Sequence, residues 1–302
     1  MAHSNLFILH DTRVLPDRDF REIVKRVRAL APDIHASLVT ERRGRVRAQW
    51  AQLLRPTLFV EMEAVAGLRH WRGAVARRRT RGKMAAYRVL EAGGLPVPLW
   101  REIVPGIRLD PAEWGPWVVV KPDLGRRGID VAAVATAELR YRAPEELPAG
   151  HLGREGPMLA QRFIRTEQGP AFYRVTTCFG EPLYALHYFN DGMRPTPDDR
   201  PLDVIANDSM GRRLTDEADL LDLARRVHAL LPEVPTIGCD ILRERDTGKL
   251  WIAEINQSGV WAFSSPSGIA IQARRGLDLY QQFGALDRAA EAMVEATRRL
   301  AR

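Results

Sequence analysis

The chain has 302 residues, 45% of them hydrophobic, which is enough to bury a sizeable core and to form two domains. No apolar run approaches membrane-spanning length and the start, MAHSNLFILH, lacks a signal-peptide pattern, so the sequence predicts a cytoplasmic protein without a membrane partner. The two cysteines, Cys178 and Cys239, lie far apart in strand-like runs, which indicates buried thiols and excludes a zinc or disulfide framework.

The formal charge of +7 comes almost entirely from arginine, and lysine occurs only at Lys25, Lys83, Lys121 and Lys249. A compact ammonium group makes point-charge contact with a phosphate in a narrow cleft, so these lysines are candidates for a specific role. The arginine runs at residues 42–47 and 77–81 lack interleaved aromatic residues, and the chain has no nucleic-acid motif. This pattern favours solvated helix faces over a nucleic-acid partner.

The first 80 residues predict a small α/β unit. Apolar runs at residues 5–10, 34–39 and 57–62 indicate strands. A helix opens at Pro16-Asp17 and keeps helical spacing until Pro32, and residues 45–54 are expected to be partly helical. Strands that alternate with helices indicate a parallel sheet. The unit contains no glycine fingerprint, so no dinucleotide is assigned to it.

A helix is expected next, from Gly82 to Ala92, where Gly93-Gly94 stops it. A strand from Trp117 then runs into a loop, residues 123–128, and a return strand at residues 129–131. The loop carries two glycines and two arginines. Glycines let backbone N–H groups approach a ligand closely, so this hairpin loop is either an anion cradle or an ordinary basic turn.

Residues 138–156 are proline-rich and are expected to be irregular, and residues 157–164 read as a strand. A hairpin follows, from residues 172–179 and 183–189, around Gly180-Glu181, a pair suited to a type II′ turn. Counting back from that turn places Arg174 opposite His187, which predicts a basic pair on one face.

Residues 190–213 hold five aspartates and three prolines and are expected to form a long functional loop. An amphipathic helix from Thr215 to Leu231 follows, with Thr215 as its candidate cap. A terminal helix is expected from about Leu277 onward.

Between these helices, residues 236–263 predict a hairpin with three oxygen ligands on one face. If Asp246-Thr247-Gly248 is a three-residue loop, Asp240 lies opposite Glu254, and Asn256 shares their face because side chains alternate along a strand. Opposed carboxylates repel unless a cation lies between them, and oxygen ligands suit Mg²⁺ or Mn²⁺. From this stretch alone, a metal site and a solvent-facing hairpin with scattered acids both remain open.

Taken in order, five features resemble the ATP-grasp superfamily, which includes D-alanyl-D-alanine ligases, glutathione synthetases and ribosomal-protein glutamate ligases. They are a lysine opening a helix that ends in GGLPVP, then VVVKPDLGRRG, LAQRFI, a strand with YRV, and an aspartate followed after 13 residues by EIN. The resemblance covers residues 81–265. It implies a two-lobed ATP-grasp domain over residues 81–302, with lobes at 81–160 and 161–302, preceded by a small parallel-sheet α/β domain at 1–80.

The resemblance also implies roles for single residues. Lys83 and Lys121 match the lysines that contact ATP phosphates. Asp240, Glu254 and Asn256 match the magnesium ligands. The remaining matches concern the loop over the phosphates, formed by Gly125, Arg126, Arg127 and Gly128, and the adenine hinge, formed by Gln161, Arg162, Phe163 and Ile164, with Glu167 as a weaker candidate for the ribose.

Arg174 is the expected residue that stabilises the transferring phosphoryl group, with His187 and Arg194 as neighbours. The chain departs from the family pattern at Gly238, where the ligases often carry arginine. Residues 257–263 lack the family's proline-glycine, and their aromatic character, with Ser258 and Trp261 as candidate substrate contacts, implies a different acceptor.

The resemblance implies a magnesium-dependent ligase that activates a carboxylate as an acylphosphate, joins it to an amine or similar nucleophile, and releases ADP and phosphate. Its partners would be small-molecule or peptide carboxylates and amines. The alternatives are an ATP-grasp small-molecule kinase and a non-catalytic nucleotide-binding module. The sequence leaves the oligomeric state open, a homodimer included.

Overall fold

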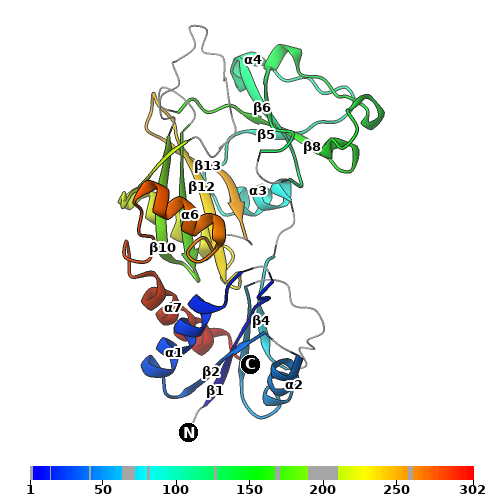
Figure 1. The fold of residues 1–302 in the computed structure, drawn as a ribbon. Coiled ribbons are helices and arrows are strands. Elements are labelled where there is room, and N and C mark those ends of the chain that lie inside the picture. The colour runs from blue at the N-terminus through cyan, green and yellow to red at the C-terminus, as the bar shows by residue number, and fades with distance from the viewer. Residues whose placement is uncertain are drawn as a thin grey trace.

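The computed structural model describes residues 3–13, 15–40, 42–62, 72–79, 82–125, 128–166, 171–189, 210–257 and 261–302. Three sheets follow one another along the long axis of the molecule (Figure 1). The N-terminal sheet lies at one end, a five-stranded sheet in the middle and a second four-stranded sheet at the other end. No helix among the described residues is long and apolar enough to cross a bilayer.

The N-terminal unit is the parallel α/β unit that the sequence predicts. Its strands are β1 (Ser4–Leu9), β2 (Ile34–Val39), β3 (Thr57–Glu61) and β4 (Ala74–Ala76), in the order β2-β1-β3-β4. They pair in parallel, and α1 (Arg18–Leu30) and α2 (Arg42–Ala51) connect them. Strand β1 is almost wholly buried, as expected for a strand covered on both faces.

The last helix, α7 (Ala285–Leu300), packs against α1 and β1 and so closes over the N-terminal unit. The backbone N–H of Thr57 also donates to the carbonyl of Arg302, at 2.8 Å. The end of the chain therefore contributes to the core of its beginning. The division into domains at residue 80 stays a prediction.

The distal sheet is antiparallel, with β5 (Trp100–Glu102), β6 (Trp117–Pro122), β7 (Ala132–Ala135) and β8 (Met158–Arg162) in the order β5-β8-β6-β7. The prediction of a return strand at residues 129–131 is wrong, because β7 starts at Ala132. Asp130 instead adopts a positive φ of 57°, which ends the loop with a turn. The helix α4 (Pro111–Trp114) and three short turns, at Thr136–Glu138, Pro144–Glu146 and Leu152–Arg154, fill the irregular stretches.

The central sheet has the order β11-β10-β9-β12-β13, and all its neighbours are antiparallel. Its strands are β9 (Phe172–Cys178), β10 (Glu181–Phe189), β11 (Gly211–Leu214), β12 (Thr236–Arg243) and β13 (Leu250–Asn256). Residues 211–213 belong to β11, which corrects their assignment to a loop. Residues 190–209 of that predicted loop lie outside the described residues.

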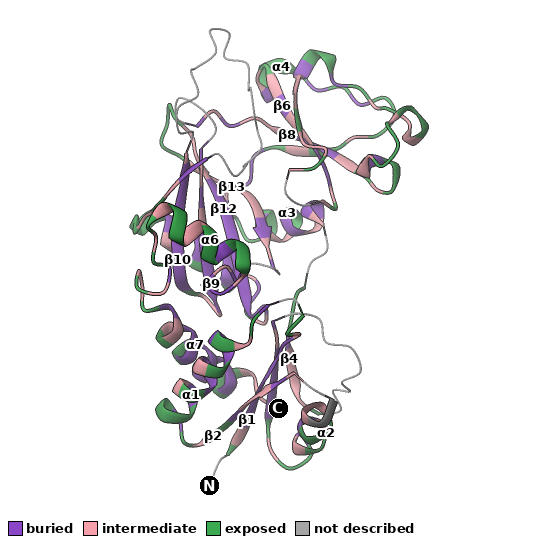
Figure 2. Cartoon of the chain, viewed as in Figure 1, coloured by how far each residue is buried: buried purple, intermediate pink, exposed green. Residues whose placement is uncertain are grey.

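Helices cover the central sheet on both faces, and its middle strands are buried (Figures 1 and 2). α5 (Ala218–Ala229) packs against β9, β10 and β12, and α3 (Lys83–Ala92) packs beside β13. α7 and α6 (Pro266–Arg275) lie on the other face. Cys178 and Cys239 are buried free thiols within this sheet, as predicted.

Two helix boundaries differ from those predicted, and one helix was not predicted. α5 begins at Ala218 with Glu217 as its N-cap, and the Thr215 hydroxyl donates to the Glu217 carboxylate rather than capping the helix. The terminal helix begins at Ala285 and not near residue 277. The sequence interpretation did not include α6.

Candidate active site

Lys83 and Lys121 are both buried, with 8% and 6% of their surface exposed. The loop that follows Lys121 is hydrogen-bonded to the start of α3, which carries Lys83. Asp123, two residues after Lys121, accepts a hydrogen bond from the Met84 N–H at 2.8 Å, and its own carbonyl accepts from the Lys83 N–H. Asp123 thereby satisfies the free N–H groups at the start of α3. Gly82 has a φ of 82°, and a Cβ there would overlap the Asp123 carboxylate. Glycine is therefore required immediately before Lys83.

The Lys121 ammonium is fixed by neutral acceptors. Its Nζ lies 2.8 Å from Gln161 Oε1 and 3.3 Å from the Ala253 carbonyl, and it sits over the ring of Tyr87. Burial lowers the pKa of Lys121 to about 8, although the nearby Glu254 carboxylate acts in the opposite direction. A lysine held at this depth by oxygen acceptors is suited to an anionic ligand.

The Ala253 carbonyl reaches Lys121 because β13 contains a bulge. Asp240 pairs with Glu254 but Ile241 pairs with Ile252, which leaves Ala253 as the extra residue. Its carbonyl accepts from the Tyr87 hydroxyl at 2.5 Å as well as from Lys121. Through this carbonyl, the bulge connects the central sheet to β6, the strand that carries Lys121.

Three charged residues lie in register across the central sheet. Asp240 on β12 pairs with Arg174 on β9 and with Glu254 on β13, so all three side chains share one face. Arg174 donates from Nε and Nη2 to the two oxygens of Asp240, each at 2.7 Å. Lys83 Nζ lies 3.6 Å from Glu254 Oε1. Each of the opposed carboxylates thus has a cation, which offsets their mutual repulsion.

The predicted Asp240–Glu254 pair is confirmed, but the turn from which it was counted is wrong. The Glu244 N–H donates to the Lys249 carbonyl, so the loop has four residues instead of three. The bulge at Ala253 then shifts the register back by one residue. Two errors of opposite sign cancel, and only Gly248, with a φ of 70°, behaves as predicted.

The predicted Arg174–His187 pair is wrong. The turn is centred on Phe179-Gly180, both with positive φ, which is typical of type I′ rather than type II′. A bulge between Pro182 and Tyr184 then shifts the register by one residue, so that Arg174 pairs with Leu186. His187 pairs with Tyr173 on the opposite face, where their rings stack at 4.4 Å. His187 is buried there and accepts from Arg213 Nε at 3.1 Å.

The donor set around Asp240 fits a hard divalent cation. Asp240 and Glu254 face each other, and the Asn256 amide lies 3.4 Å from Asp240. The described residues hold no cluster of three or more histidine, cysteine, aspartate or glutamate side chains that could bind a metal. Two carboxylates and one amide match the protein share of a magnesium site, where water and phosphate oxygens complete the shell.

The predicted adenine hinge is partly occupied by backbone bonds. The N–H of Arg162 donates to Leu99 O at 2.7 Å, and that of Phe163 donates to Trp117 O at 3.3 Å. The Arg162 guanidinium also pairs with Glu244, at 3.3 Å. These two N–H groups are therefore not available to adenine. That the hinge binds adenine stays a prediction, and it now concerns the hinge carbonyl groups and Ile164.

The remaining predicted residues lie in three kinds of place. The Gly125 carbonyl accepts from Lys83 Nζ at 3.3 Å, and Gly128 has a φ of 71°, so both border the phosphate-side loop. Trp261 is 3% exposed and donates to Asp19 of α1 at 2.8 Å, which places it in the packing against the N-terminal unit. Five predicted residues lie outside the described residues, namely Arg126, Arg127, Glu167, Arg194 and Ser258.

The sequence and the structure were compared with those of known proteins. No protein-family model and no curated protein matches the sequence. Among solved structures, D-cycloserine synthetase DcsG aligns with a TM-score of 0.56 at 19% identity, over 97% of this chain and 99% of that one. The ATP-grasp ligase PsnB, complexed with a minimal precursor, Mg and ADP, gives 0.52 at 14%, over 97% and 98%.

D-alanine–D-alanine ligase from Bacillus anthracis, complexed with ATP, gives a TM-score of 0.50 at 11% identity, over 99% of this chain and 98% of that one. The three proteins therefore match the chain over nearly its whole length. The chain has the ATP-grasp fold, with a small α/β unit at its N-terminus. At these identities the likeness is one of fold.

Proposed function

We propose that this protein is an ATP-dependent ligase that activates a carboxylate as an acylphosphate and transfers the acyl group to an amine. The observation that carries this proposal is the charged row of Arg174, Asp240 and Glu254, with the buried Lys83 and Lys121 beside it. Three cations and two carboxylates meet on one face of the central sheet, on a fold that the three ligases named above share.

Lys83 and Lys121 would bind the phosphate oxygens of ATP. Both ammonium groups are shielded from water, where a charge contact is stronger than at the surface. Asp240, Glu254 and Asn256 would hold a Mg²⁺ ion, which neutralises charge on the β- and γ-phosphates. When Asp240 is engaged in this way, Arg174 can turn its N–H donors to the transferring phosphoryl group.

The reaction then proceeds in two balanced steps. A substrate carboxylate oxygen attacks the γ-phosphorus, forming the acylphosphate as the bond to ADP breaks. An amine attacks the acyl carbon, losing a proton as inorganic phosphate leaves. In both steps the protein contributes chiefly position and fixed charge.

Hydroxylamine provides a test that does not require the natural amine. The protein, ATP, Mg²⁺ and hydroxylamine are incubated with a panel of amino acids and short peptides, and hydroxamate, ADP and phosphate are measured. We expect equal amounts of the three products. AMP with pyrophosphate, or a stable phosphoester, would overturn the ligase assignment.

Glu254→Gln tests the metal site within that assay. The amide keeps the shape of the side chain but removes the charge opposite Asp240, so turnover should fall at least ~1,000-fold. Glu181→Gln, an exposed residue at the start of β10, is the matched control and should keep full activity. Full activity of Glu254→Gln would refute the assigned site.

A further inference from the structure

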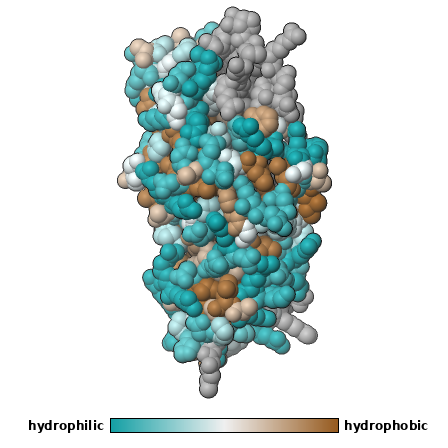
Figure 3. All heavy atoms as spheres, turned by 90° about the vertical axis from the view of Figure 1, so that its left-hand side faces the viewer, coloured by the Kyte–Doolittle hydropathy of each residue, from teal (hydrophilic) through white to brown (hydrophobic). Residues whose placement is uncertain are grey.

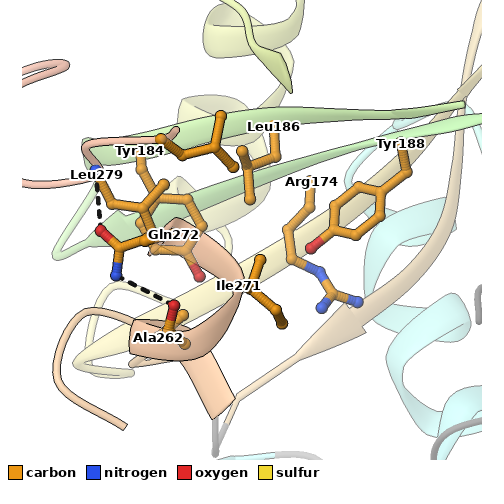
Figure 4. A pocket seen from close by; sticks show the side chains of 10 residues that line it. Arg174, Tyr184, Leu186, Tyr188, Ala262, Ile271, Gln272 and Leu279 are labelled. Carbon is orange, nitrogen blue, oxygen red and sulfur yellow. Dashed lines mark hydrogen bonds between the residues drawn. The ribbon is translucent and has the colours of Figure 1, made fainter. Parts of the chain in front are cut away.

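A cavity of about 80 Å³ lies between β10 and α6, directly beside Arg174 (Figure 4). Tyr184, Leu186 and Tyr188 of β10 line its sheet side, and Ile271 and Gln272 of α6 line the other. Leu277 and Leu279 complete the lining. In a space-filling view, hydrophobic side chains reach the surface at about the height of α6 (Figure 3).

Gln272, the amide in the lining, is already paired with the protein. Gln272 donates to the Phe263 and Gly268 carbonyls at 3.0 and 3.3 Å and accepts from the Leu279 N–H at 3.1 Å. Burial raises the pKa of Tyr184 to about 12, so its hydroxyl carries no charge at neutral pH. Leu186, Ile271, Leu277 and Leu279 supply the aliphatic part of the lining, so an aliphatic group inside the cavity would find apolar contacts.

Arg174 forms the one charged part of the lining and has donors to spare. Its pair with Asp240 uses two of the five guanidinium N–H donors. Among the described residues, no further hydrogen-bond partner of this guanidinium is found. Its side chain is 31% exposed, so the remaining donors can reach a ligand. Because Arg174 lines the cavity, a carboxylate bound at its guanidinium would lie beside the apolar part of the lining.

The size of the cavity limits what can follow that carbon. An apolar cavity of about 150 Å³ holds a benzene ring of six carbons, which is about 25 Å³ per carbon. By that ratio, 80 Å³ accommodates about three carbons. An isopropyl group fits, whereas a benzyl group does not.

We propose that this cavity is the side-chain subsite of the carboxylate substrate and that it selects an aliphatic side chain of about three carbons. The inference rests on the proposed ligase function, because it takes Arg174 as the residue beside the reacting carboxylate. It adds the substrate class, a small branched aliphatic acid such as an α-amino acid with a valine-like side chain.

The test measures hydroxamate formation with glycine, alanine, valine, leucine and phenylalanine, each as the L and the D form. We expect kcat/KM to be highest for valine in one of the two forms. Each methyl group missing from the cavity should cost about tenfold. Phenylalanine should be at least ~100-fold poorer than valine, because its ring exceeds the space available.

Ile271→Ala removes three carbons from the cavity wall and should shift the preference toward longer side chains. The ratio of kcat/KM for phenylalanine to that for valine should rise at least ~10-fold. Ile269→Ala is the matched control, because Ile269 is on the same helix, is 54% exposed and does not line the cavity. Melting temperatures confirm folding, and Ile271→Val, expected to favour leucine, replaces Ile271→Ala if that variant unfolds.

The outcomes separate the two proposals. If the wild type forms hydroxamate but its preference is flat, or stays unchanged in Ile271→Ala, the cavity is not the subsite and the ligase function stands. If none of these five amino acids gives hydroxamate while another carboxylate of the broader panel does, the subsite is overturned and the ligase function stands. AMP with pyrophosphate, or a stable phosphoester, overturns the ligase function and this inference with it. A shift in Ile271→Ala but not in Ile269→Ala supports the subsite.

Discussion

The two faces of the central sheet are built from alternate residues of the same strands, yet they differ in kind. On one face Arg174, Asp240 and Glu254 form a charged row. On the other, Tyr173 and Val175 are packed among the buried residues of α5. A shift of one residue in strand pairing would exchange the two faces. The difference teaches that register, more than composition, decides which side chains of these strands can act on a ligand.

The strongest test of this division compares Arg174 with His187, one from each face. Arg174→Lys keeps the charge but loses the two-pronged pair with Asp240, so turnover should fall ~100-fold while the melting temperature changes little. His187→Gln removes a buried ring that stacks on Tyr173, so it should lower the melting temperature and leave turnover per folded molecule unchanged.

Thermal melting and the hydroxamate assay, applied to both variants, check this pair of expectations. If His187→Gln lost activity as severely as Arg174→Lys while remaining folded, the two faces would not be functionally distinct.

Gly82→Ala tests whether the close contact between Gly82 and Asp123 positions Lys83 beside the charged row. A Cβ at this position would overlap Asp123 and strain a φ of 82°, so the start of α3 and Lys83 should move. We expect the KM for ATP to rise ~10-fold or more. Gly94→Ala, at the other end of α3, also has a positive φ but no atom within 4 Å, so it should cost stability alone. Equal KM values in the two variants would show that Asp123 does not position Lys83.

The fold of the N-terminal unit follows from local pattern, which explains why the sequence predicts it well. Continuous apolar runs separated by an amphipathic helix leave few alternatives to a parallel sheet, and β2 begins and ends at the predicted residues. α6 also has local signals, with Ser265 capping, Pro266 at the first turn and Gly276 in the left-handed conformation after its end. These signals are sufficient to predict α6 from the sequence.

The candidate site was predictable only in part. The scarcity of lysine drew attention to all four lysines, and the family resemblance selected Lys83 and Lys121, both of which lie near Glu254 in the folded chain. Counting from turns is sensitive to a single bulge, however, and nothing in the residue pattern reveals the extra residue at Ala253. The roles of Asp123 and Tyr87 arise from contacts between distant segments, which one sequence does not display.

On the packed face, His228 of α5 makes stability depend on pH. Its Nε2 donates to the Val234 carbonyl at 2.8 Å and its Nδ1 accepts from the Thr177 hydroxyl at 2.7 Å. Burial lowers the pKa of His228 from 6.5 to about 4, so the unfolded chain binds more protons between these values. The stability that His228 contributes is present above pH 6.5 and is lost as the pH falls toward 4.

Urea unfolding should show this group losing about 2 kcal/mol between pH 7 and pH 5. His228→Gln should reduce that difference, whereas His3→Gln, at an exposed position, should not. An unchanged pH dependence in His228→Gln would place the titrating group elsewhere.

The smallest effect is expected at Tyr87 of α3, which is fully buried. Its hydroxyl donates to the Ala253 carbonyl, which also accepts from Lys121. Tyr87→Phe keeps the ring beneath the ammonium and leaves that carbonyl with one donor, so unfolding should become easier by only about 1 kcal/mol. Lys121 retains Gln161, so the KM for ATP should stay within about threefold. If Tyr87→Phe raised the KM for ATP as much as Gly82→Ala does, the Ala253 bulge would position Lys121 only with the help of Tyr87. The charged face would then depend on a side chain anchored in the packed core.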